Sequence, residues 1–368
     1  METVRERGAL PDLSAHEARS ILIVRFKALG DIALSLPIVR AVRDRYPHAR
    51  LRYLCRRQYA EALQGVGELD DVLVLPEGGA RQVSLALRLR REKTDCVLDL
   101  ISSPRSAYMT FLTGAAMRIG MDTGRRNWCY THLLPRVIMR DGKRVLCYTL
   151  ESNRELVRML GLEPDRAPGL ETGFPAARAE LRWAEDFVAG LGAGGGKRII
   201  GIVPGSAYQA KSWPEGRFVE LVRLARERLG AVPVILWGPG EEDLAGRIAA
   251  LAGGSVLAPP MGIARLGALI SKLDLLVGID SGPKHLAVIQ GVPTVTLFGP
   301  TDPRIWDPMT STHRAIRLDV DCIPCKKKTC VENSCLSGIT PGMVMAEIEG
   351  VLALKAGADG GPGKGGCA

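Results

Sequence analysis

One carboxylate stands where catalysis could use it. Asp31 follows Gly30 shortly after the apolar run Ile21–Phe26. Glycine permits a tight turn from a strand into a helix, so Asp31 would lie at or near the helix start. There it either caps the helix, which stabilises a helix by about 1 kcal/mol, or faces a cleft and acts as a base. The residues alone leave both interpretations open.

A second segment offers groups that bind phosphate. Residues 204–214 read PGSAYQAKSWP after a strong apolar run, and Pro214 is well placed to open a helix. Ser206 contributes a hydroxyl and Lys211 a mobile positive charge. An ordinary loop with a solvated lysine is the structural alternative. The coincidence of hydroxyl, glycine and lysine favours phosphate binding.

A third segment, GIDSGPKH at 278–285, passes from an apolar strand into a helix. Such a turn presents backbone N–H groups and the positive end of the helix dipole to an anion. Ser281 and Gly282 suit a phosphate, and His285 either donates to a diphosphate or lies buried in a helix interface. Asp280 would repel phosphate, so we expect it to hold sugar hydroxyls or to brace the loop.

Four cysteines are clustered near the C-terminus. Their spacing is Cys322-x2-Cys325-x4-Cys330-x4-Cys335. Four converging thiolates are typical of a structural zinc site. An iron–sulfur cluster, reduced thiols and an adventitious disulfide are the alternatives. The segment FGPTDP at 298–303 predicts only a turn.

The elements that must position these groups alternate between strands and helices, which indicates βαβ units and parallel sheets. The pattern weakens between about residues 161 and 197, where Pro and Gly are frequent, and then restarts. We therefore predict two doubly wound α/β domains with the site in the cleft between them. The expected parts are a flexible N-terminus (1–20), an N-terminal domain (21–175), a linker (176–197), a C-terminal domain (198–340), a helix (341–356) and a disordered tail (357–368).

Composition narrows the class of partner. The formal charge is +9, and residues 40–57 hold seven arginines against the single acid Asp44. This stretch is either a solvated basic face or a surface that attracts an anionic partner. Aromatic residues make up only 5%, which disfavours nucleic-acid binding by base stacking. No apolar run is long enough to span a bilayer and the N-terminus lacks a signal-peptide core, so we expect a cytoplasmic protein that touches the inner membrane face at most.

These segments together resemble glycosyltransferase family 9, the ADP-heptose:lipopolysaccharide heptosyltransferases. The resemblance rests on ILIVRFKALGDIALSLPIVRAVR, on PGS…KSWP, and on DSGPKHLA followed by GVPTVTLFGPTDP, in that order. It extends from about Ile21 to Leu354 and implies the GT-B fold, two Rossmann-like domains with the active site between them.

The resemblance also implies roles. The N-terminal half would receive a phosphorylated lipid A or core glycan acceptor, and the C-terminal half would bind an ADP-sugar. Asp31 matches the family's general base in an inverting transfer that requires no metal. The residues that match its donor and phosphate positions are Ser206, Lys211, Asp280, Ser281, Gly282 and His285. Lys284 departs from the pattern by placing a basic residue inside the donor loop.

Two points stay open at this stage. Either Glu241 or Glu242 could meet the nucleotide ribose or base. The rival functions are a nucleotide-sugar epimerase or dehydrogenase and a non-catalytic binder of anionic glycans. The missing G-x-G-x-x-G after the first strand argues against bound NAD, and motifs in both halves argue against a mere binder.

Overall fold

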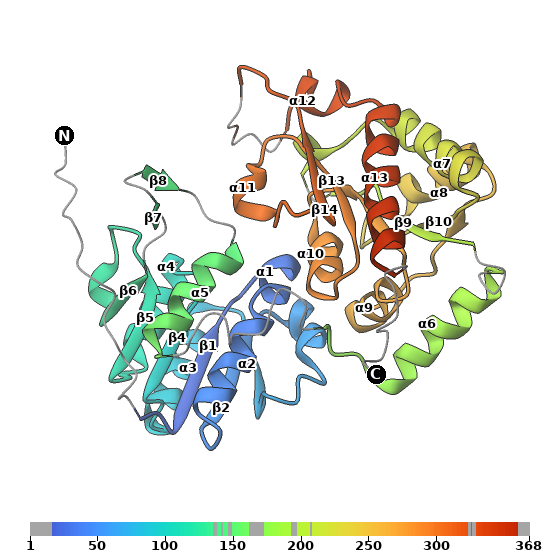
Figure 1. The fold of residues 1–368 in the computed structure, drawn as a ribbon. Coiled ribbons are helices and arrows are strands. Elements are labelled where there is room, and N and C mark those ends of the chain that lie inside the picture. The colour runs from blue at the N-terminus through green and yellow to red at the C-terminus, as the bar shows by residue number, and fades with distance from the viewer. Residues whose placement is uncertain are drawn as a thin grey trace, which may run out of the picture. The chain divides into compact units, whose positions relative to one another are not determined.

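The structure, a computed structural model, describes residues 17–134, 138–140, 143–145, 149–161, 173–192, 197–206, 208–322, 325 and 329–359. The chain divides into two compact units (Figure 1). The first holds Met1–Ala28 and Leu34–Thr172, and the second holds Leu29–Ala33 and Gly173–Ala368. Most of the predicted flexible N-terminus and of the predicted tail lies outside the described residues.

The first unit is built on a six-stranded parallel sheet in the order β3-β2-β1-β4-β5-β6. Its central strand, with the sequence SILIV, is almost entirely buried because helices cover both faces of such a sheet. The strands are β1 (Ser20–Val24), β2 (Arg50–Cys55), β3 (Asp71–Val74), β4 (Cys96–Asp99), β5 (Met117–Met121) and β6 (His132–Leu134). A separate antiparallel pair joins β7 (Ile138–Arg140) to β8 (Lys143–Val145).

Helices pack on this sheet in neighbouring pairs. They are α2 (Leu36–Arg45), η1 (Arg57–Leu63, a 3₁₀ helix), α3 (Gly79–Arg91), α4 (Pro104–Leu112), η2 (Asn127–Cys129) and α5 (Thr149–Met159). Contacts join α2 to α5 and α3 to α4. Leu85 and Leu89 of α3 and Met109 of α4 share one core cluster with Leu22 and Val24 of β1.

The second unit repeats the same topology. Its sheet has the order β11-β10-β9-β12-β13-β14 and is parallel throughout. The strands are β9 (Ile199–Val203), β10 (Val232–Ile235), β11 (Val256–Leu257), β12 (Leu275–Ile279), β13 (Thr294–Phe298) and β14 (His313–Arg317). The helices are α1 (Leu29–Ala33), α6 (Arg178–Gly190), η4 (Gln209–Lys211), α7 (Glu215–Leu229), α8 (Glu242–Ala252), α9 (Ile263–Ile270), α10 (Gly282–Ile289), α11 (Pro303–Trp306), α12 (Ser334–Ser337) and α13 (Pro341–Asp359).

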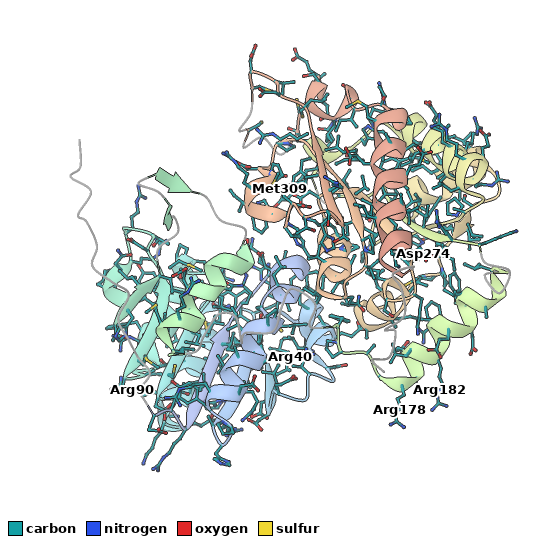
Figure 2. The ribbon with its side chains drawn as sticks, viewed as in Figure 1. Arg40, Arg90, Arg178, Arg182, Asp274 and Met309 are labelled. Atoms are coloured by element: carbon teal, nitrogen blue, oxygen red, sulfur yellow. The ribbon has the colours of Figure 1, made fainter. Side chains whose placement is uncertain are left out.

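In each sheet an aspartate ties together the two central strands, between which the strand order reverses. Asp274, just before β12, accepts a hydrogen bond of 2.8 Å from the backbone N–H of Ile199 in β9 (Figure 2). Asp95, just before β4, accepts bonds from the N–H groups of Arg19 and Ser20 at the start of β1. The two units therefore share a structural device as well as a strand order.

The α/β prediction of two doubly wound sheets is confirmed. The predicted linker 176–197 contains α6, which belongs to the second unit, and the helix expected to start near Asp31 is divided into α1 and α2. The final helix continues to Asp359, past the expected end at 356. Among the described residues no helix combines the length and apolarity that crossing a membrane requires.

Candidate active site

Four loops bring the predicted donor residues to one edge of the second sheet. They follow β9, β10, β12 and β13, which are neighbours and all parallel. Since the carboxyl ends of parallel strands meet at one edge, these loops lie together there. The strand order reverses between β9 and β12, and ligands of doubly wound sheets bind at such a reversal.

Lys211 and Asp280 meet across this reversal. Lys211 Nζ donates to Asp280 Oδ2 at 2.6 Å and to the Asp280 carbonyl at 3.2 Å. Thr301 Oγ1 donates to the same Oδ2 at 2.8 Å. Thr301 lies in the loop that sequence reasoning treated as an ordinary turn. The signal that could have found it is its position directly after a buried strand next to β12.

Asp280 is an ionised brace. Burial alone would raise the pKa of this carboxyl, but the charges of Lys211 and then Lys284 outweigh burial and hold it below its usual value. The side chain is 6% exposed. Of the two roles expected for Asp280, this geometry favours bracing the loop, because the carboxylate is already engaged by Lys211 and Thr301.

The N-terminus of α10 has unused polar groups. Ser281 is its N-cap residue, yet its side chain makes no capping hydrogen bond, and its buried Oγ has no hydrogen-bond partner in the described structure. The same holds for Nδ1 of His285. Free N–H groups, a hydroxyl and an imidazole thus lie at the positive end of a helix dipole, which suits an anionic group.

His285 is a neutral imidazole. Burial, and secondly the charge of Lys284, lower its pKa to about 3. Its Nε2 lies 3.9 Å from Asp280 Oδ1, too far for a hydrogen bond. The structural and functional alternatives for this residue therefore coincide, since it is buried against Trp306 and still has an unpaired ring nitrogen. As a neutral ring it offers one N–H donor and no positive charge.

Lys284 has a partner that sequence reasoning missed. Its ammonium lies 3.0 Å from Asp307 Oδ2, with both side chains at 1% exposure or less, and it also donates to the carbonyl of Trp306. The pKa of Lys284 is lowered by burial, which the charges of Asp307 and Asp280 only partly offset. This pair joins α10 to the end of α11. No feature near Lys284 in the sequence indicates Asp307, which follows more than twenty residues later.

The helix that carries Asp31 packs against α10 inside the second unit. A Cβ on Gly30 would lie 2.3 Å from Cδ2 of His285, and one on Gly282 would lie 3.1 Å from the Leu29 side chain. Glycine at both positions is what allows this close approach. Asp31 is the third residue of α1 and lies in its first turn, so it is not the N-cap. The two glycines therefore bring the helix of Asp31 onto the helix whose N-terminus bears Ser281.

The structure distinguishes Glu241 from Glu242, the two acids that could meet the nucleotide ribose or base. Glu241 Oε2 accepts from the N–H of Gly238 at 2.9 Å, and its carboxylate lies so close to Gly205 that a Cβ there would be 2.1 Å away. Glu242 is the exposed first residue of α8. Ser206, in the same loop as Gly205, accepts from the N–H of Tyr208 at 3.2 Å. Glu241 is therefore the acid that reaches the loop of Ser206.

The cysteine segment braces these loops. Gln209 exchanges two hydrogen bonds with the backbone of Cys330, and the N–H of Cys325 donates to Pro300. Cys322, Cys325, Cys330 and Cys335 are not joined in disulfides. Nowhere in the described residues are three or more Cys, His, Asp or Glu side chains arranged to hold a metal ion. The thiols as they lie do not form a zinc site, and zinc stays a prediction from their spacing.

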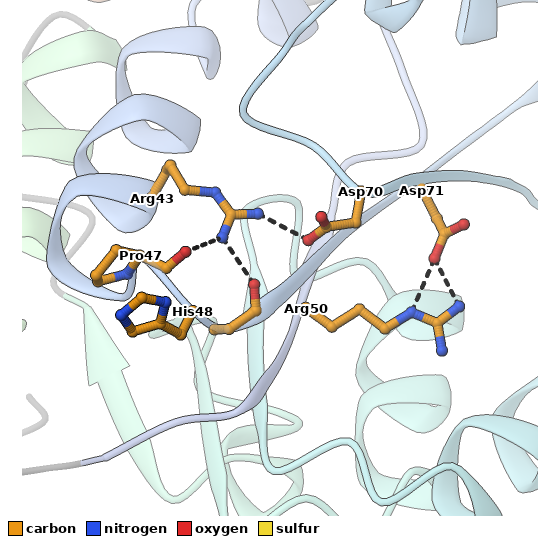
Figure 3. Close-up of a pocket in the computed structure, with 7 residues that line it drawn as sticks. Arg43, Pro47, His48, Arg50, Asp70 and Asp71 are labelled. Atoms are coloured by element: carbon orange, nitrogen blue, oxygen red, sulfur yellow. Dashed lines mark hydrogen bonds and ion pairs between the residues drawn. The ribbon is translucent and has the colours of Figure 1, made fainter.

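A hollow of about 450 Å³ lies in the first unit, at the edge of its sheet where β2 and β3 begin. Figure 3 shows that its arginines are already engaged. Arg43 donates to Asp70 and to the carbonyls of Pro47 and Ala49, and Arg50 donates to Asp71. Outside the hollow, Arg40 pairs with Glu68 and Arg52 with Glu92. Of the two interpretations of the arginines at 40–57, these pairs favour the structural one.

Comparisons with known proteins agree with this architecture. A family model described as glycosyltransferase family 9 (heptosyltransferase) matches residues 82–336. Lipopolysaccharide heptosyltransferase 3 of Escherichia coli is 26% identical over 300 residues, 77% of this chain and 84% of that protein. A solved family 9 glycosyltransferase from Veillonella parvula superposes with a TM-score of 0.75 at 22% identity, covering 94% of this chain and 99% of the other. The E. coli heptosyltransferase WaaC, solved with ADP-2-deoxy-2-fluoro heptose, gives 0.65 at 21% identity, covering 90% and 99%.

The two Rossmann-like units and the likeness to this solved structure show the GT-B fold. The matched family model spans well over half of the sequence, so the chain belongs to glycosyltransferase family 9 (heptosyltransferase). This assignment favours the transferase over the epimerase, dehydrogenase and glycan-binder alternatives.

Proposed function

We propose that the protein transfers a heptose from an ADP-sugar to a hydroxyl of the lipopolysaccharide core, with inversion at the anomeric carbon. The names of its relatives support the sugar and the acceptor class, since the E. coli relative is a lipopolysaccharide heptosyltransferase. The WaaC structure with an ADP-heptose analogue supports the donor.

The donor diphosphate would bind at the edge formed by Lys211, Ser281 and the N-terminus of α10. Lys211 carries the positive charge, and the unpaired Ser281 Oγ and His285 ring nitrogen supply hydrogen bonds. As the bond from the anomeric carbon to the β-phosphate oxygen breaks, ADP gains negative charge. Donors fixed in advance stabilise that charge without reorganising, which lowers the barrier.

Asp31 would be the general base. The acceptor oxygen forms the new bond to the anomeric carbon while its proton passes to the Asp31 carboxylate. A positioned base typically contributes about 10²–10⁴ in rate. The observation that carries this proposal is the packing of α1 on α10, which the two glycines at 30 and 282 permit. It puts α1, whose only acid is Asp31, against α10, whose N-terminus offers the proposed anion-binding groups.

Substitution of Asp31 by Asn tests this role. Asn keeps the size of the side chain and removes the base, so Asp31→Asn should lower turnover about a hundredfold or more and leave ADP affinity within about twofold. The matched control is Asp243→Asn, which alters an exposed acid of α8. Near-normal turnover of Asp31→Asn in a steady-state transfer assay would exclude it as the base.

The rest of the proposal concerns surroundings. The acceptor is a phosphorylated lipid A bearing the core glycan, and the protein works in the cytoplasm in peripheral contact with the inner membrane. Glu241 is the candidate for the ribose or base, because it lies against the loop of Ser206. A zinc ion at the cysteine segment, if bound, would hold that segment against the loops of Gln209 and Pro300 and would take no part in transfer.

A further inference from the structure

The first unit exposes a cluster of aromatic side chains on α4 and η2. Tyr108, Phe111 and Trp128 are 49%, 43% and 58% exposed. Their rings contact one another, with Phe111 and Trp128 edge to face at 5.1 Å and Tyr108 and Trp128 tilted at 6.1 Å. Because Trp128 contacts both other rings and all three face water, they form a contiguous apolar patch, and such patches mark interaction surfaces.

Two aliphatic side chains on the neighbouring helix α3 extend the patch. Val83 and Leu87 are 43% and 38% exposed and stand one helical turn apart on the same side. The contact between α3 and α4, and their shared core below, put both outer faces on the same side of the first unit. These residues are five of the twelve exposed large apolar side chains in the described part of the chain, so the concentration is local.

The charges on the helices of the patch have one sign. Arg81, Arg88, Arg90 and Arg91 lie on α3, Arg105 on α4, and Arg125 just before η2, and all are exposed. The sequences of α3, α4 and η2 contain no Asp or Glu. Among these six arginines, only Arg88 forms an ion pair with a carboxylate of the described residues, namely Glu92 at 3.6 Å. We call the five apolar and six basic side chains the α3–α4 face.

We infer that the α3–α4 face docks the protein on an anionic lipid surface. Tyr and Trp rings favour the interface between water and lipid, and arginine stems lie along apolar surface while their charged heads reach phosphate groups. A second copy of the chain does not fit, because a two-fold contact through this face would set the arginines against each other. Single-stranded nucleic acid fits poorly, since Val83 and Leu87 cannot stack on bases.

This inference names the surface for the membrane contact and rests on the proposed function only in that a lipid-borne acceptor gives the contact a purpose. The first unit is the half expected to receive that acceptor. None of the residues in the face belongs to the donor edge, so docking and transfer can be measured separately.

The test is co-sedimentation of the full chain with vesicles of phosphatidylethanolamine and phosphatidylglycerol, and with vesicles of phosphatidylcholine. We expect binding to the first, reduced by salt, and at least about tenfold weaker binding to the second. Phe111→Ser/Trp128→Ser and Arg105→Gln/Arg125→Gln should each weaken binding to the anionic vesicles about tenfold or more. The control for the aromatic variant is Leu251→Ser/Leu354→Ser, which changes two exposed apolar residues outside the face. The control for the arginine variant is Arg178→Gln/Arg182→Gln, whose arginines are exposed on α6 (Figure 2).

Three results would overturn the inference. They are equal binding to both kinds of vesicle, equal loss of binding in the control variants, and a wild-type dimer in light scattering that the aromatic variant abolishes. An unchanged melting temperature shows that a variant is folded, and the arginine variant decides the matter if the aromatic one is not. Transfer to a deacylated, water-soluble core glycan should be unchanged in all variants. Loss of that activity in the wild type would instead count against the proposed function.

Discussion

At the scale of single residues, the direction of the Lys211 ammonium matters as much as its charge. An ammonium has three N–H donors, and two of them are used on the side chain and carbonyl of Asp280. In the proposed donor complex, the third would donate to a phosphate oxygen. Thr301 holds the same carboxylate oxygen from the other side, so Asp280 cannot easily turn away. A charge fixed in this way binds an anion without first paying for the ordering of a long side chain.

Lys211→Ala should therefore weaken ADP binding by about 1–3 kcal/mol, the value of a lost charged hydrogen bond. Isothermal titration with ADP measures this directly. Lys272→Ala is the matched control, because Lys272 also pairs with an acid, Glu185 at 2.7 Å, but lies outside the donor loops. Unchanged ADP affinity in Lys211→Ala would refute the assignment of the phosphate site.

At the scale of elements, the buried pair of Lys284 and Asp307 ties α10 to α11. Removing one partner leaves the other charge buried without compensation, which typically costs about 3–5 kcal/mol. Replacing both by apolar residues of similar size is far less costly, because no charge is then desolvated. Lys284 also lies over the ring of Phe298, so a long apolar side chain would keep that contact.

Lys284→Met alone should thus destabilise the protein by about 3–5 kcal/mol, and Lys284→Met/Asp307→Leu should recover most of that loss. Urea unfolding of the wild type, both single variants and the double variant gives the coupling energy. Arg247→Met with Glu215→Leu is an exposed control pair, whose coupling should be much smaller because solvent screens the two charges. Additive losses in the Lys284 and Asp307 variants would show that the pair is not a brace.

Which elements the sequence could predict follows from how apolar they are. The bounds of β12, β13 and α7 can be predicted from the sequence, because two are buried apolar runs and the third has a regular helical period. The break between α1 and α2 was missed, although Pro37 near the start of α2 is a start signal. Helix α4 escaped prediction because its outer face is aromatic, which hides the helical period.

Prediction of the site had a different limit. Ser206, Lys211, Asp280 and His285 could be proposed as site residues because each stands after a strand, where ligands of parallel sheets bind. The bond from Thr301 to Asp280 depends on β12 and β13 being neighbours, which is a property of strand order and not of local spacing.

At the scale of the whole molecule, a net charge of +9 says little until its distribution is known. The densest arginine stretch, 40–57, is largely neutralised by acids of its own unit, as in the pairs of Arg43 with Asp70 and Arg50 with Asp71. The α3–α4 face has fewer ion pairs and carries five of the exposed large apolar side chains. The spacing of arginines along the chain therefore indicates residues 40–57 as the anion-attracting surface, whereas the folded structure favours the α3–α4 face.

Acid stability is also distributed unevenly between the two units. Burial is the main cause that lowers the pKa of His285 to about 3 and that of His313 to about 4. The first unit's described histidines, His48 and His132, are not buried. Above the unfolded pKa of about 6.5, the rings of His285 and His313 are neutral in both states and stability does not depend on their protonation. Below it, the unfolded chain takes up protons that the folded second unit refuses, so that unit loses stability as the pH falls.

Between about pH 6.5 and pH 5 each of the two buried rings should cost the second unit about 2 kcal/mol. The depressed pKa of Asp280 acts only at lower pH, because its stabilisation is lost below its unfolded pKa of about 4. Urea unfolding at about pH 7.5 and pH 5 should show that the free energy of unfolding falls much more for the second unit than for the first. His313→Asn removes one of the two buried rings and should remove about half of this pH dependence. A second unit that is equally stable at both pH values would mean that water or a counter-charge reaches these rings in the folded state, and the donor edge around His285 would then be less dry than its packing indicates.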